Sequence, residues 1–410
     1  MENLQPKLRF PEFKEEWKMY FISDFFKVGS SKRVKQEDWK TEGIPFYRTR
    51  ELVKLSKNEK IENEIFISEE HYNDLKSKYG VPKIGDLLIS GVGTLGISYV
   101  VTNNNPFYIK DGNVLWFNKV KNINSLFFNY NFKTRFLLSQ ILNNASATTV
   151  GTYTIDNAKK TKFFCTEIQE QTKIADFLSS VDKQLDILNQ KKEKLNLYKK
   201  GTMQQLFSQQ IRFKDDNGND FPDWEDTKIG EVCQIKRGAS PRPISNPKWF
   251  DENSKIGWVR ISDVTKSKNI LQTTTQYLSE EGISKSRLVK KDNLIMSICA
   301  TIGKPIYTGF DVCIHDGFVV FENLNCVHQY LFYYLDFIQE KWYKYGQPGT
   351  QINLNSTIVS DEYFPLPKSL AEQTKIANFL SVIDTQIEAV ENHITKTETY
   401  KKGLLQQMFV

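Results

Sequence analysis

Two stretches of this chain repeat each other: EQTKIADFLSSVDKQLDILNQKKEKLNLYKKGTMQQLFS at residues 170–208 and EQTKIANFLSVIDTQIEAVENHITKTETYKKGLLQQMFV at residues 372–410. They align without a gap, and about half of their positions are identical. Self-similarity at a fixed offset indicates a repeated architecture. The chain is therefore predicted to alternate twice between a variable region and a repeated helix.

Both copies have the apolar spacing of a coiled coil. Apolar residues recur in steps of four and three from Ile174 to Leu188, and again from Ile376 to Val390. The alternative is an amphipathic helix packed on its own domain. Pairing of the two copies is favoured because each helix is too long to be covered by a domain of this size. Leu8–Phe13 resembles the sequence that follows the first copy, so we expect the two chain ends to lie together and the helices to run antiparallel.

The regions before the two copies also repeat, more loosely. The matched segments are Ile44–Arg48 with Ile256–Arg260, Leu87–Ser90 with Leu294–Ser297, Asp111–Gly112 with Asp316–Gly317, and Gly151–Thr152 with Gly349–Thr350. Short runs bounded by Gly, Asn and Pro indicate strands in both regions, and segments such as Ser125–Asn143 have a helical pattern.

The expected fold class is α+β, with two pseudo-symmetric α/β domains joined by two long antiparallel helices that form a coiled coil. The predicted boundaries are 1–166 for the first domain, 167–210 for the central spacer helix, 211–367 for the second domain and 368–410 for the C-terminal spacer helix.

Composition excludes several classes of protein. Of the 410 residues, 40% are hydrophobic, which is ordinary globular composition. No apolar run reaches the roughly 18 residues of a membrane span, and the mixed-charge N-terminus is unlike a secretory signal. The five cysteines are few and never spaced as CxxC, which favours a reducing compartment over a disulfide framework or a zinc ribbon. We therefore expect a cytoplasmic protein.

No catalytic constellation, metal-ligand cluster or cofactor motif emerges from the sequence. Gly91–Gly96 fits GxGxxG, but the following ISYVV indicates a strand, whereas a dinucleotide site needs a helix there. A hairpin loop is favoured. A stand-alone nucleotide-binding enzyme that uses this loop stays open as an alternative.

Charge is distributed unevenly along a chain of net charge +6. Residues 1–165 carry 25 Lys and Arg against 18 Asp and Glu, and residues 211–366 carry 18 against 20. The first domain is basic and the second is not, so a DNA-binding role for the second must rest on local clusters.

Such clusters occur at matching places in both domains. Arg and Lys bond to guanine edges and Gln to adenine, while hydroxyl groups hold phosphates. The alternative for any one cluster is a solvated surface. We predict DNA contacts at Lys32, Arg33, Lys35, Arg48, Arg50, Ser90, Thr94, Thr152 and Tyr153, and at Lys236, Arg237, Arg242, Arg260, Ser297, Thr301, Lys304, Thr350 and Gln351.

Four motifs carry a family likeness. They are EQTKIA-x-FLS at 170 and 372, Tyr-Lys-Lys-Gly at 198 and 400, Phe-Pro-Leu-Pro at 364–367, and Ser-x-x-x-Thr-x-Gly at 90 and 297. With them the chain resembles the specificity subunit of type I restriction–modification enzymes along nearly its full length. The first copy departs from the pattern at residues 162–166, KFFCT, which lack the prolines and blur that domain boundary.

The resemblance implies a function. In such subunits two target recognition domains each read one half of a bipartite double-stranded DNA site. The helices act as a spacer and dock two methyltransferase subunits, which in turn recruit motor–nuclease subunits. The subunit itself is implied to be non-catalytic, without a cofactor or a membrane partner.

Identical residues at the start of each helix are the predicted methyltransferase contacts, and we expect them to be exposed. They are Glu170, Gln171 and Lys173 in the first copy and Glu372, Gln373 and Lys375 in the second. Alternatively they cap the helices, since Glu near a helix N-terminus is favoured by the dipole. A coiled-coil adaptor that does not bind DNA also stays open.

Overall fold

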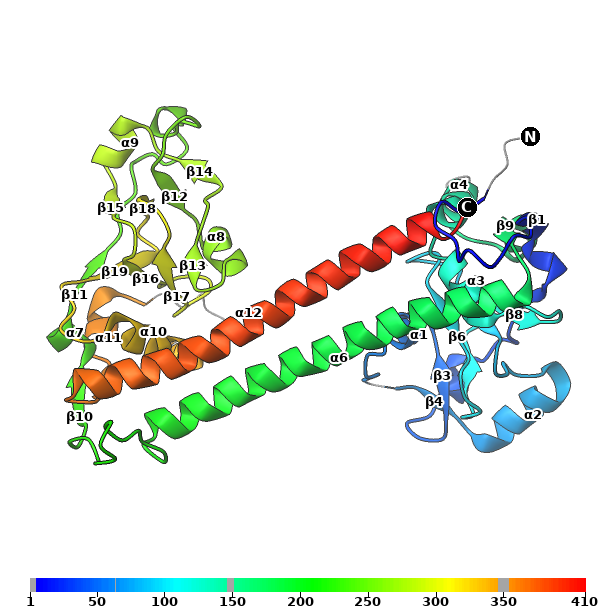
Figure 1. Ribbon diagram of the computed structural model, residues 1–410, viewed down its shortest axis with the longest axis horizontal. Helices are drawn as coiled ribbons and strands as arrows, with labels where there is room; N and C mark the ends of the chain where they lie inside the picture. Colours follow the sequence, from blue (N-terminus) through cyan, green and yellow to red (C-terminus); the bar gives the residue numbers. More distant parts are fainter. Residues whose placement is uncertain (1–4, 63, 146–150, 346–353) are drawn as a thin grey trace. The chain divides into compact units, whose positions relative to one another are not determined.

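The computed structural model describes residues 5–62, 64–145, 151–345 and 354–410. The chain divides into two compact units, one formed by Met1–Asn189 with Asn392–Val410 and the other by Gln190–Glu391. Each unit combines sheets and short helices with parts of both long helices, α6 (Ile168–Phe207) and α12 (Leu370–Gln407) (Figure 1). The predicted α+β class with two long helices is confirmed.

The first unit contains a four-stranded antiparallel sheet in the order β2-β8-β5-β6, a three-stranded sheet in the order β4-β3-β7, and the antiparallel pair β1–β9. The strands are β1 (Lys18–Phe21), β2 (Phe26–Ser30), β3 (Ile44–Tyr47), β4 (Phe66–Ile67), β5 (Leu87–Ser90), β6 (Ser98–Val100), β7 (Tyr108–Ile109), β8 (Val114–Lys119) and β9 (Lys162–Cys165). The short helices are α1 (Thr49–Ser56), α2 (Glu69–Tyr79), α3 (Ser125–Asn131), α4 (Arg135–Ala145) and α5 (Ile155–Lys160).

The second unit has the same plan with two added edge strands. Its sheets have the orders β11-β19-β16-β17-β13 and β14-β12-β18-β15, beside the pair β10–β20. The strands are β10 (Glu225–Lys228), β11 (Gln234–Arg237), β12 (Gly257–Val259), β13 (Ile270–Leu271), β14 (Gln276–Tyr277), β15 (Arg287–Val289), β16 (Leu294–Ser297), β17 (Pro305–Thr308), β18 (Val312–Ile314), β19 (Phe318–Glu322) and β20 (Tyr363–Leu366). The short helices are α7 (Ile229–Val232), α8 (Ile261–Lys266), α9 (Glu280–Ser284), α10 (His328–Phe337) and α11 (Ser356–Ser360).

The sheet topology of the two units matches strand for strand. The order β2-β8-β5-β6 corresponds to β11-β19-β16-β17, and β4-β3-β7 corresponds to β14-β12-β18. In both units one neighbouring pair of the smaller sheet is parallel, β3 with β7 and β12 with β18. The duplication seen in the sequence is therefore a duplication of the fold.

The strands β5 and β16, which correspond in the two units, are buried on both faces. In β5, Leu87 and Ile89 enter the main core of the first unit, while Leu88 packs on the opposite side with Leu52 and Ile109. A strand covered on both faces has a continuous apolar sequence instead of an alternating one. The same holds for β16 in the second unit, where all four side chains are buried.

The two long helices run antiparallel within each unit. In the first unit the end of α12 packs into the core beside the start of α6, with Leu404 next to Ile174 and Leu178 in one cluster. In the second unit Leu206 of α6 shares a cluster with Ile376 of α12. The end of one helix lies beside the start of the other in both units, which confirms the predicted pairing and its direction.

The N-terminal segment packs against the end of the chain. The backbone N–H of Leu8 donates to the carbonyl of Gln407 at 2.8 Å. The matching bond in the second unit joins the N–H of Ile211 to the carbonyl of Gln205 at 3.3 Å, within a continuous stretch of chain. The described start of the chain therefore lies beside the end of α12, as expected from the repeat (Figure 1).

Candidate nucleic-acid interface

A tight turn between β18 and β19 organises the basic residues of the second unit. The carboxylate of Asp316 accepts from the Ser240 hydroxyl at 2.7 Å and from Nη2 of Arg242 at 2.9 Å. The backbone carbonyl of Asp316 accepts from Nε of Arg237 at 2.7 Å. Burial alone would raise the pKa of Asp316, but Ser240 and Arg242 lower it below its usual value, so the carboxylate stays ionised. One turn thus holds two of the predicted DNA-contacting arginines.

The arginines at this turn remain open to solvent. The Arg242 side chain is 71% exposed even though one of its nitrogens is bound to Asp316. Arg237 is exposed as well. A guanidinium that is oriented by a carboxylate and still faces solvent keeps further N–H donors free for a partner.

Two other basic residues of this unit are used inside the fold. Arg260 follows β12, and its Nε donates to Oε1 of Gln276 at 2.9 Å, with the guanidinium over the Trp258 ring. Lys236 on β11 forms an ion pair with Glu322 on the neighbouring strand β19 at 2.6 Å. Arg260 is partly buried, and the charge of Lys236 is neutralised by Glu322 within the sheet.

The Ser/Thr hairpin between β16 and β17 is held by its own serine. Ser297 is fully buried, its hydroxyl donates to the carbonyl of Thr301, and it accepts from the N–H of Lys304 at 3.3 Å. The Lys304 ammonium donates to the carbonyls of Val264 and Ser267, both at 2.8 Å, at the end of α8. Burial lowers the pKa of Lys304. The prediction that Ser297 and Lys304 contact DNA is therefore not supported by their positions, since both polar groups are used to fix the loop.

The first unit has the corresponding turn at Asp111 and Gly112, before β8. Lys110 lies 3.4 Å from Asp111, and the N–H of Gly112 donates to the Ser30 hydroxyl at 3.0 Å. The N–H of Lys110 donates to the carbonyl of Tyr47, which brings the start of α1 beside the turn. In this unit a lysine takes the place of the arginines at the aspartate.

The loop after β2 carries exposed cations near that turn. The Lys32 ammonium lies 5.5 Å from the centre of the Tyr79 ring, beside a shallow pocket of about 290 Å³. Lys35 is exposed and pairs with Glu37 at 3.0 Å. Arg33 is exposed and makes no hydrogen bond or ion pair with the part of the chain that the structure describes. Arg33 is therefore the first unit's most available guanidinium among the predicted residues.

Arg48 and Arg50 both bind one buried carboxylate. Glu51 is 1% exposed, and it accepts from Nη2 of Arg48 at 2.8 Å and from Nε of Arg50 at 2.9 Å. Burial raises the pKa of Glu51, but these two arginines outweigh burial and lower it. In the structure both arginines neutralise Glu51 in the first turn of α1. The sequence did not indicate this pairing.

Two further predicted residues belong to the interior. Ser90 is buried, its hydroxyl donates to the carbonyl of Thr94 at 2.5 Å and accepts from the N–H of Ile97 at 2.8 Å. Tyr153 is 1% exposed, and its hydroxyl lies 2.8 Å from that of Thr161. Their positions do not favour direct DNA contact, because their polar atoms already have partners inside the unit.

The loop that fits GxGxxG is a hairpin. β5 is followed by β6, and no helix begins after Gly96 in this part of the chain. Thr94 is exposed at its tip, and Thr152 bridges to Val92 within the same loop cluster. Thr301 occupies the position of Thr94 in the second unit, with its hydroxyl 3.2 Å from that of Thr265. Thr350 and Gln351 lie outside the described residues.

The predicted methyltransferase contacts are mostly buried, which corrects the expectation of exposure. Glu170 and Glu372 are both fully buried. Arg9 holds Glu170 through two bonds of 2.7 Å, and Arg212 holds Glu372 through bonds of 3.1 and 3.0 Å. These forked pairs attach the first residues of each domain to the start of a long helix.

The two glutamines have an equally internal role. The side chain of Gln171 accepts from the N–H of Asn124, and that of Gln373 accepts from the N–H of Val327, at 2.9 and 2.7 Å. Lys173 is exposed and pairs with Glu12, and Lys375 is half-buried and pairs with Asp216. Four of the six residues thus fix helix starts, and only the lysines remain accessible.

A repeated side-chain cluster of the long helices was not predicted from the sequence. In the second unit Lys199 of α6 pairs with Asp384 of α12 at 2.9 Å and with Asp336 at 3.2 Å. Asp384 also accepts from the Tyr333 hydroxyl at 2.9 Å. Burial alone would lower the pKa of Lys199, but the two aspartates raise it.

The first unit repeats this cluster with equivalent residues. Lys401 of α12 pairs with Asp182 of α6, and Asp182 accepts from the Tyr130 hydroxyl at 2.6 Å. Burial, followed by the bond to Asp182, raises the pKa of Tyr130. The available signal was the Tyr-Lys-Lys-Gly motif, whose first lysine is the ion-pairing residue in both copies.

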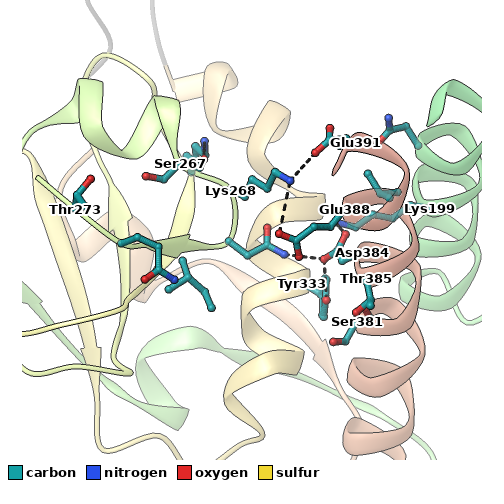
Figure 2. Close-up of a pocket in the computed structure, with 16 residues that line it drawn as sticks. Lys199, Ser267, Lys268, Thr273, Tyr333, Ser381, Asp384, Thr385, Glu388 and Glu391 are labelled. Carbon is teal, nitrogen blue, oxygen red and sulfur yellow. Dashed lines mark hydrogen bonds and ion pairs between the residues drawn. The ribbon is translucent and has the colours of Figure 1, made fainter. Parts of the chain in front are cut away.

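A pocket of about 640 Å³ lies beside this cluster in the second unit (Figure 2). Lys268, which lines the pocket, forms ion pairs with Glu391 at 2.6 Å and with Glu388 at 3.8 Å. The side-chain amide of Asn269 donates a hydrogen bond to Asp384 at 2.8 Å. Figure 2 shows the Lys268 side chain pointing toward Glu388 and Glu391 of α12. The contacts attach the segment after α8 to α12.

Neither a metal cluster nor a membrane-crossing helix occurs in the residues that the structure describes. They hold no group of three or more His, Cys, Asp or Glu side chains placed to bind a metal ion. None of their helices is both long enough and apolar enough to cross a membrane.

Comparison with known proteins agrees with this duplicated architecture. The family model described as "Type I restriction modification DNA specificity domain" matches twice, at residues 14–197 and 222–398. The Type I restriction enzyme MjaVIII specificity subunit of Methanocaldococcus jannaschii is 27% identical, over 97% of this chain and 92% of that protein. The putative MjaX specificity subunit of the same organism is 25% identical, over 97% and 94%.

Solved structures show the same fold. The S subunit of the type I restriction–modification system of M. genitalium aligns with a TM-score of 0.60 at 15% identity, covering 99% of both chains. A chain from a study of assembly and conformational transition in the type I R-M system aligns with a TM-score of 0.61 at 15% identity, covering 96% of both. With two matches to the family model that span most of its length, this chain belongs to the family of type I restriction–modification specificity subunits.

Proposed function

We propose that this chain selects the DNA sequence on which a type I restriction–modification complex acts. Two target recognition domains, residues 1–166 and 211–367, each read one half of a bipartite, asymmetric double-stranded site. The helices at 167–210 and 368–410 set the gap between the halves and dock two methyltransferase subunits. Motor–nuclease subunits then join through the methyltransferases, and the complex works in the cytoplasm.

The observation that carries this proposal is the oriented arginine of the second unit. Arg242 is bound by Asp316, and most of its side chain faces solvent. A guanidinium forms two parallel bonds with O6 and N7 of guanine in the major groove. Because Asp316 already restricts the side chain, less conformational freedom is lost when those bonds form. We therefore assign a guanine in one half-site to Arg242.

The first unit supports a different half-site. Its equivalent turn has Lys110 at Asp111, and its exposed guanidinium, Arg33, comes from the loop after β2 without a carboxylate partner among the described residues. Different side chains on matching scaffolds favour different bases. Two related domains facing two unlike half-sites explain why the recognised sequence is asymmetric.

We propose no catalytic residue in this chain, so modification and cleavage belong to the partner subunits. The alternative of a nucleotide-binding enzyme is less favoured, because β6 follows Gly91–Gly96 and no helix begins in the described residues between Gly96 and α3, whereas a pyrophosphate needs a helix N-terminus. The alternative of an adaptor without DNA contact is an outcome of the following experiment.

The test is to assemble the chain with its methyltransferase subunits and map methylated sites genome-wide. Arg242→Ala is expected to relax one position of one half-site, with a loss of about 1–3 kcal/mol against the guanine-containing site. Asp316→Asn should give a smaller loss at the same position. Arg33→Ala should affect only the other half-site.

Lys248→Ala is the matched control, because Lys248 is half-exposed and pairs with Glu281 instead of Asp316. Uniform weakening across sequences by Arg242→Ala, with a smaller salt dependence, would make that residue a phosphate contact. If the wild-type complex showed no sequence preference in DNA binding, the alternative of an adaptor would stand.

A further inference from the structure

A shallow pocket of about 290 Å³ lies on the four-stranded sheet of the first unit, beside the loop after β2. Its lining contains two ammonium groups, two aromatic rings and an amide, and no carboxylate. Its volume is at the small end of the range for ligand pockets. The lining includes Lys27 and Gly29 of β2, Lys32 of the loop that follows, Tyr79 at the end of α2, and Trp116 and Asn118 of β8.

The glycine at position 29 is not explained by the packing of this chain. Gly29 lies inside β2, where glycine weakens a strand, and its φ is not in the positive region that would require glycine. A Cβ built on it would meet no atom within 4 Å. A glycine inside a strand often marks a place where a ligand or another backbone approaches closely. Because the described residues leave the space above Gly29 open, that place is available to a ligand.

The second unit fills the equivalent place with charged side chains. The register of the two sheets matches Gly29 with Lys236 and Asn118 with Glu322. Lys236 and Glu322 form an ion pair at 2.6 Å between β11 and β19. The second unit thus neutralises this part of its sheet internally, whereas the first unit leaves ammonium groups beside an open pocket.

The side chains of the pocket keep binding groups that the fold does not use. The Lys27 ammonium and the Asn118 amide make no hydrogen bond or ion pair with the part of the chain that the structure describes. Tyr79 is 52% exposed, although the Lys32 ammonium lies 5.5 Å from the centre of its ring. Trp116 is held in place because its Nε1 donates to Asp86 at 2.8 Å. The pocket therefore offers an aromatic face, two positive charges and an amide on a fixed support.

We propose that this pocket binds one nucleotide whose base is unpaired. The base stacks on Tyr79, the phosphate binds Lys27 and Lys32, and the Asn118 amide bonds to the edge of the base. The excess of cations in residues 1–165, 25 Lys and Arg against 18 Asp and Glu, favours such an anion.

The nucleotide has two possible sources. A paired base is already stacked within its duplex, so the ring that stacks on Tyr79 belongs either to a nucleotide extruded from the bound DNA or to a free mononucleotide. The pocket shares no residue with the Gly91–Gly96 loop. The inference goes beyond the proposed function, since reading base pairs in a groove requires no unpaired nucleotide.

The first experiment titrates the purified full chain with AMP, adenosine and inorganic phosphate, with isothermal titration calorimetry as the readout. AMP should bind more tightly than adenosine or phosphate, because only AMP has both the ring and the charge. Tyr79→Ala should weaken AMP binding by roughly 5- to 100-fold, the effect of losing one base–aromatic stack. Tyr79→Phe keeps the ring and should bind AMP like the wild type. Lys27→Gln should reduce the preference for AMP over adenosine.

Tyr363→Ala is the matched control. Tyr363 of β20 is 56% exposed, and the Lys228 ammonium lies 5.6 Å from the centre of its ring, so the variant removes a similar aromatic–ammonium pair from the second unit. It should leave AMP binding unchanged. Because Tyr79 and Tyr363 are both exposed, neither variant should shift the thermal unfolding midpoint, which separates lost binding from misfolding.

The second experiment distinguishes the two sources of the nucleotide. The complex with methyltransferase subunits is titrated with duplexes that contain its mapped recognition site, either fully paired or with one extra unpaired nucleotide at successive positions in and beside each half-site. The DNA is the source if a bulged duplex binds more tightly than the paired one and Tyr79→Ala removes that advantage. A free mononucleotide is the source if only AMP binding depends on Tyr79.

Three results would overturn the pocket. The first is binding of inorganic phosphate as tightly as AMP, since the lysines alone would explain it. The second is that Tyr79→Ala changes the binding of neither AMP nor a bulged duplex, and the third is that Tyr363→Ala has the same effect as Tyr79→Ala. A complex that still prefers its recognition site in these cases leaves the proposed function standing, whereas a complex without sequence preference contradicts that function and not the AMP result.

Discussion

Lys199 of α6 lies 2.9 Å from Asp384 of α12, and both residues are largely buried in the second unit. The equivalent pair in the first unit joins Lys401 of α12 to Asp182 of α6. The donor comes from the end of one helix and the acceptor from the first half of the other. Each pair therefore specifies the antiparallel register of the two helices within its unit, which apolar packing alone leaves less defined.

Lys199→Met is expected to destabilise the second unit by about 2 kcal/mol, between the values for exposed and fully buried ion pairs. The substitution leaves Asp384 partly buried with one cation fewer. Chemical denaturation measures the change in the free energy of unfolding. Lys200→Met, at a side chain that is 75% exposed, should change it by less than about 0.5 kcal/mol. Equal effects of the two variants would remove the assigned role of Lys199.

Stability of the second unit should fall below neutral pH because of His315. Burial lowers the pKa of His315, opposed by the neighbouring Asp316, and its Nδ1 accepts from the N–H of Gly317 at 2.8 Å. A histidine whose folded pKa lies below its unfolded value of about 6.5 stabilises the fold above pH 6.5. That contribution is lost as the pH falls through the folded pKa.

The measurement is the free energy of unfolding at pH 7.5 and at pH 5 for the wild type and for His315→Gln. The glutamine side chain accepts the same hydrogen bond but does not titrate. The wild type should lose more stability than the variant over this interval. An identical pH dependence of the two proteins would show that His315 does not contribute.

The proposed spacer role predicts the effect of lengthening both helices. Four residues inserted after Asn189 in α6 and four after Glu391 in α12 add about one helical turn, or 5.4 Å, at the boundaries between the units. At 3.4 Å per base pair, the gap between the half-sites should grow by about one to two base pairs. Methylome sequencing reads the gap directly. An unchanged gap would contradict the spacer role, and changed half-sites would show that the insertion disturbed the domains.

A circular permutant should fold and keep its sequence preference. The bond from Leu8 to Gln407 in the first unit corresponds to the bond from Ile211 to Gln205 in the second, where the chain is continuous. The permutant joins Val410 to Met1 with a short Gly/Ser linker and opens the chain between Gln209 and Gln210. The bond from Leu8 to Gln407 then lies within continuous chain, and the bond from Ile211 to Gln205 joins the two new ends. The expected result is one cooperative unfolding transition and an unaltered set of methylated sites. Loss of the fold would mean that the two junctions are not equivalent.

Sequence patterns predicted local elements well where periodicity was strong. The matched apolar segments Leu87–Ser90 and Leu294–Ser297 are both strands, β5 and β16. The helical pattern at Ser125–Asn143 is instead divided into α3 and α4, because Phe132 packs in the core between them. Periodicity does not show where a chain must turn to place one large side chain.

The sequence by itself determined the duplication, the α+β class and the pairing of the long helices, because a repeat and an apolar spacing are properties of neighbouring residues. Only the tertiary structure decided which polar residues face a partner. Glu170 looked exposed in sequence, yet it is fully buried against Arg9, 161 residues away. Arg48 was predicted to contact DNA, and its guanidinium binds the buried carboxylate of Glu51, whereas Arg242 stays largely exposed beside Asp316. Burial and ion pairing depend on contacts between distant segments, and these form only when the chain has folded.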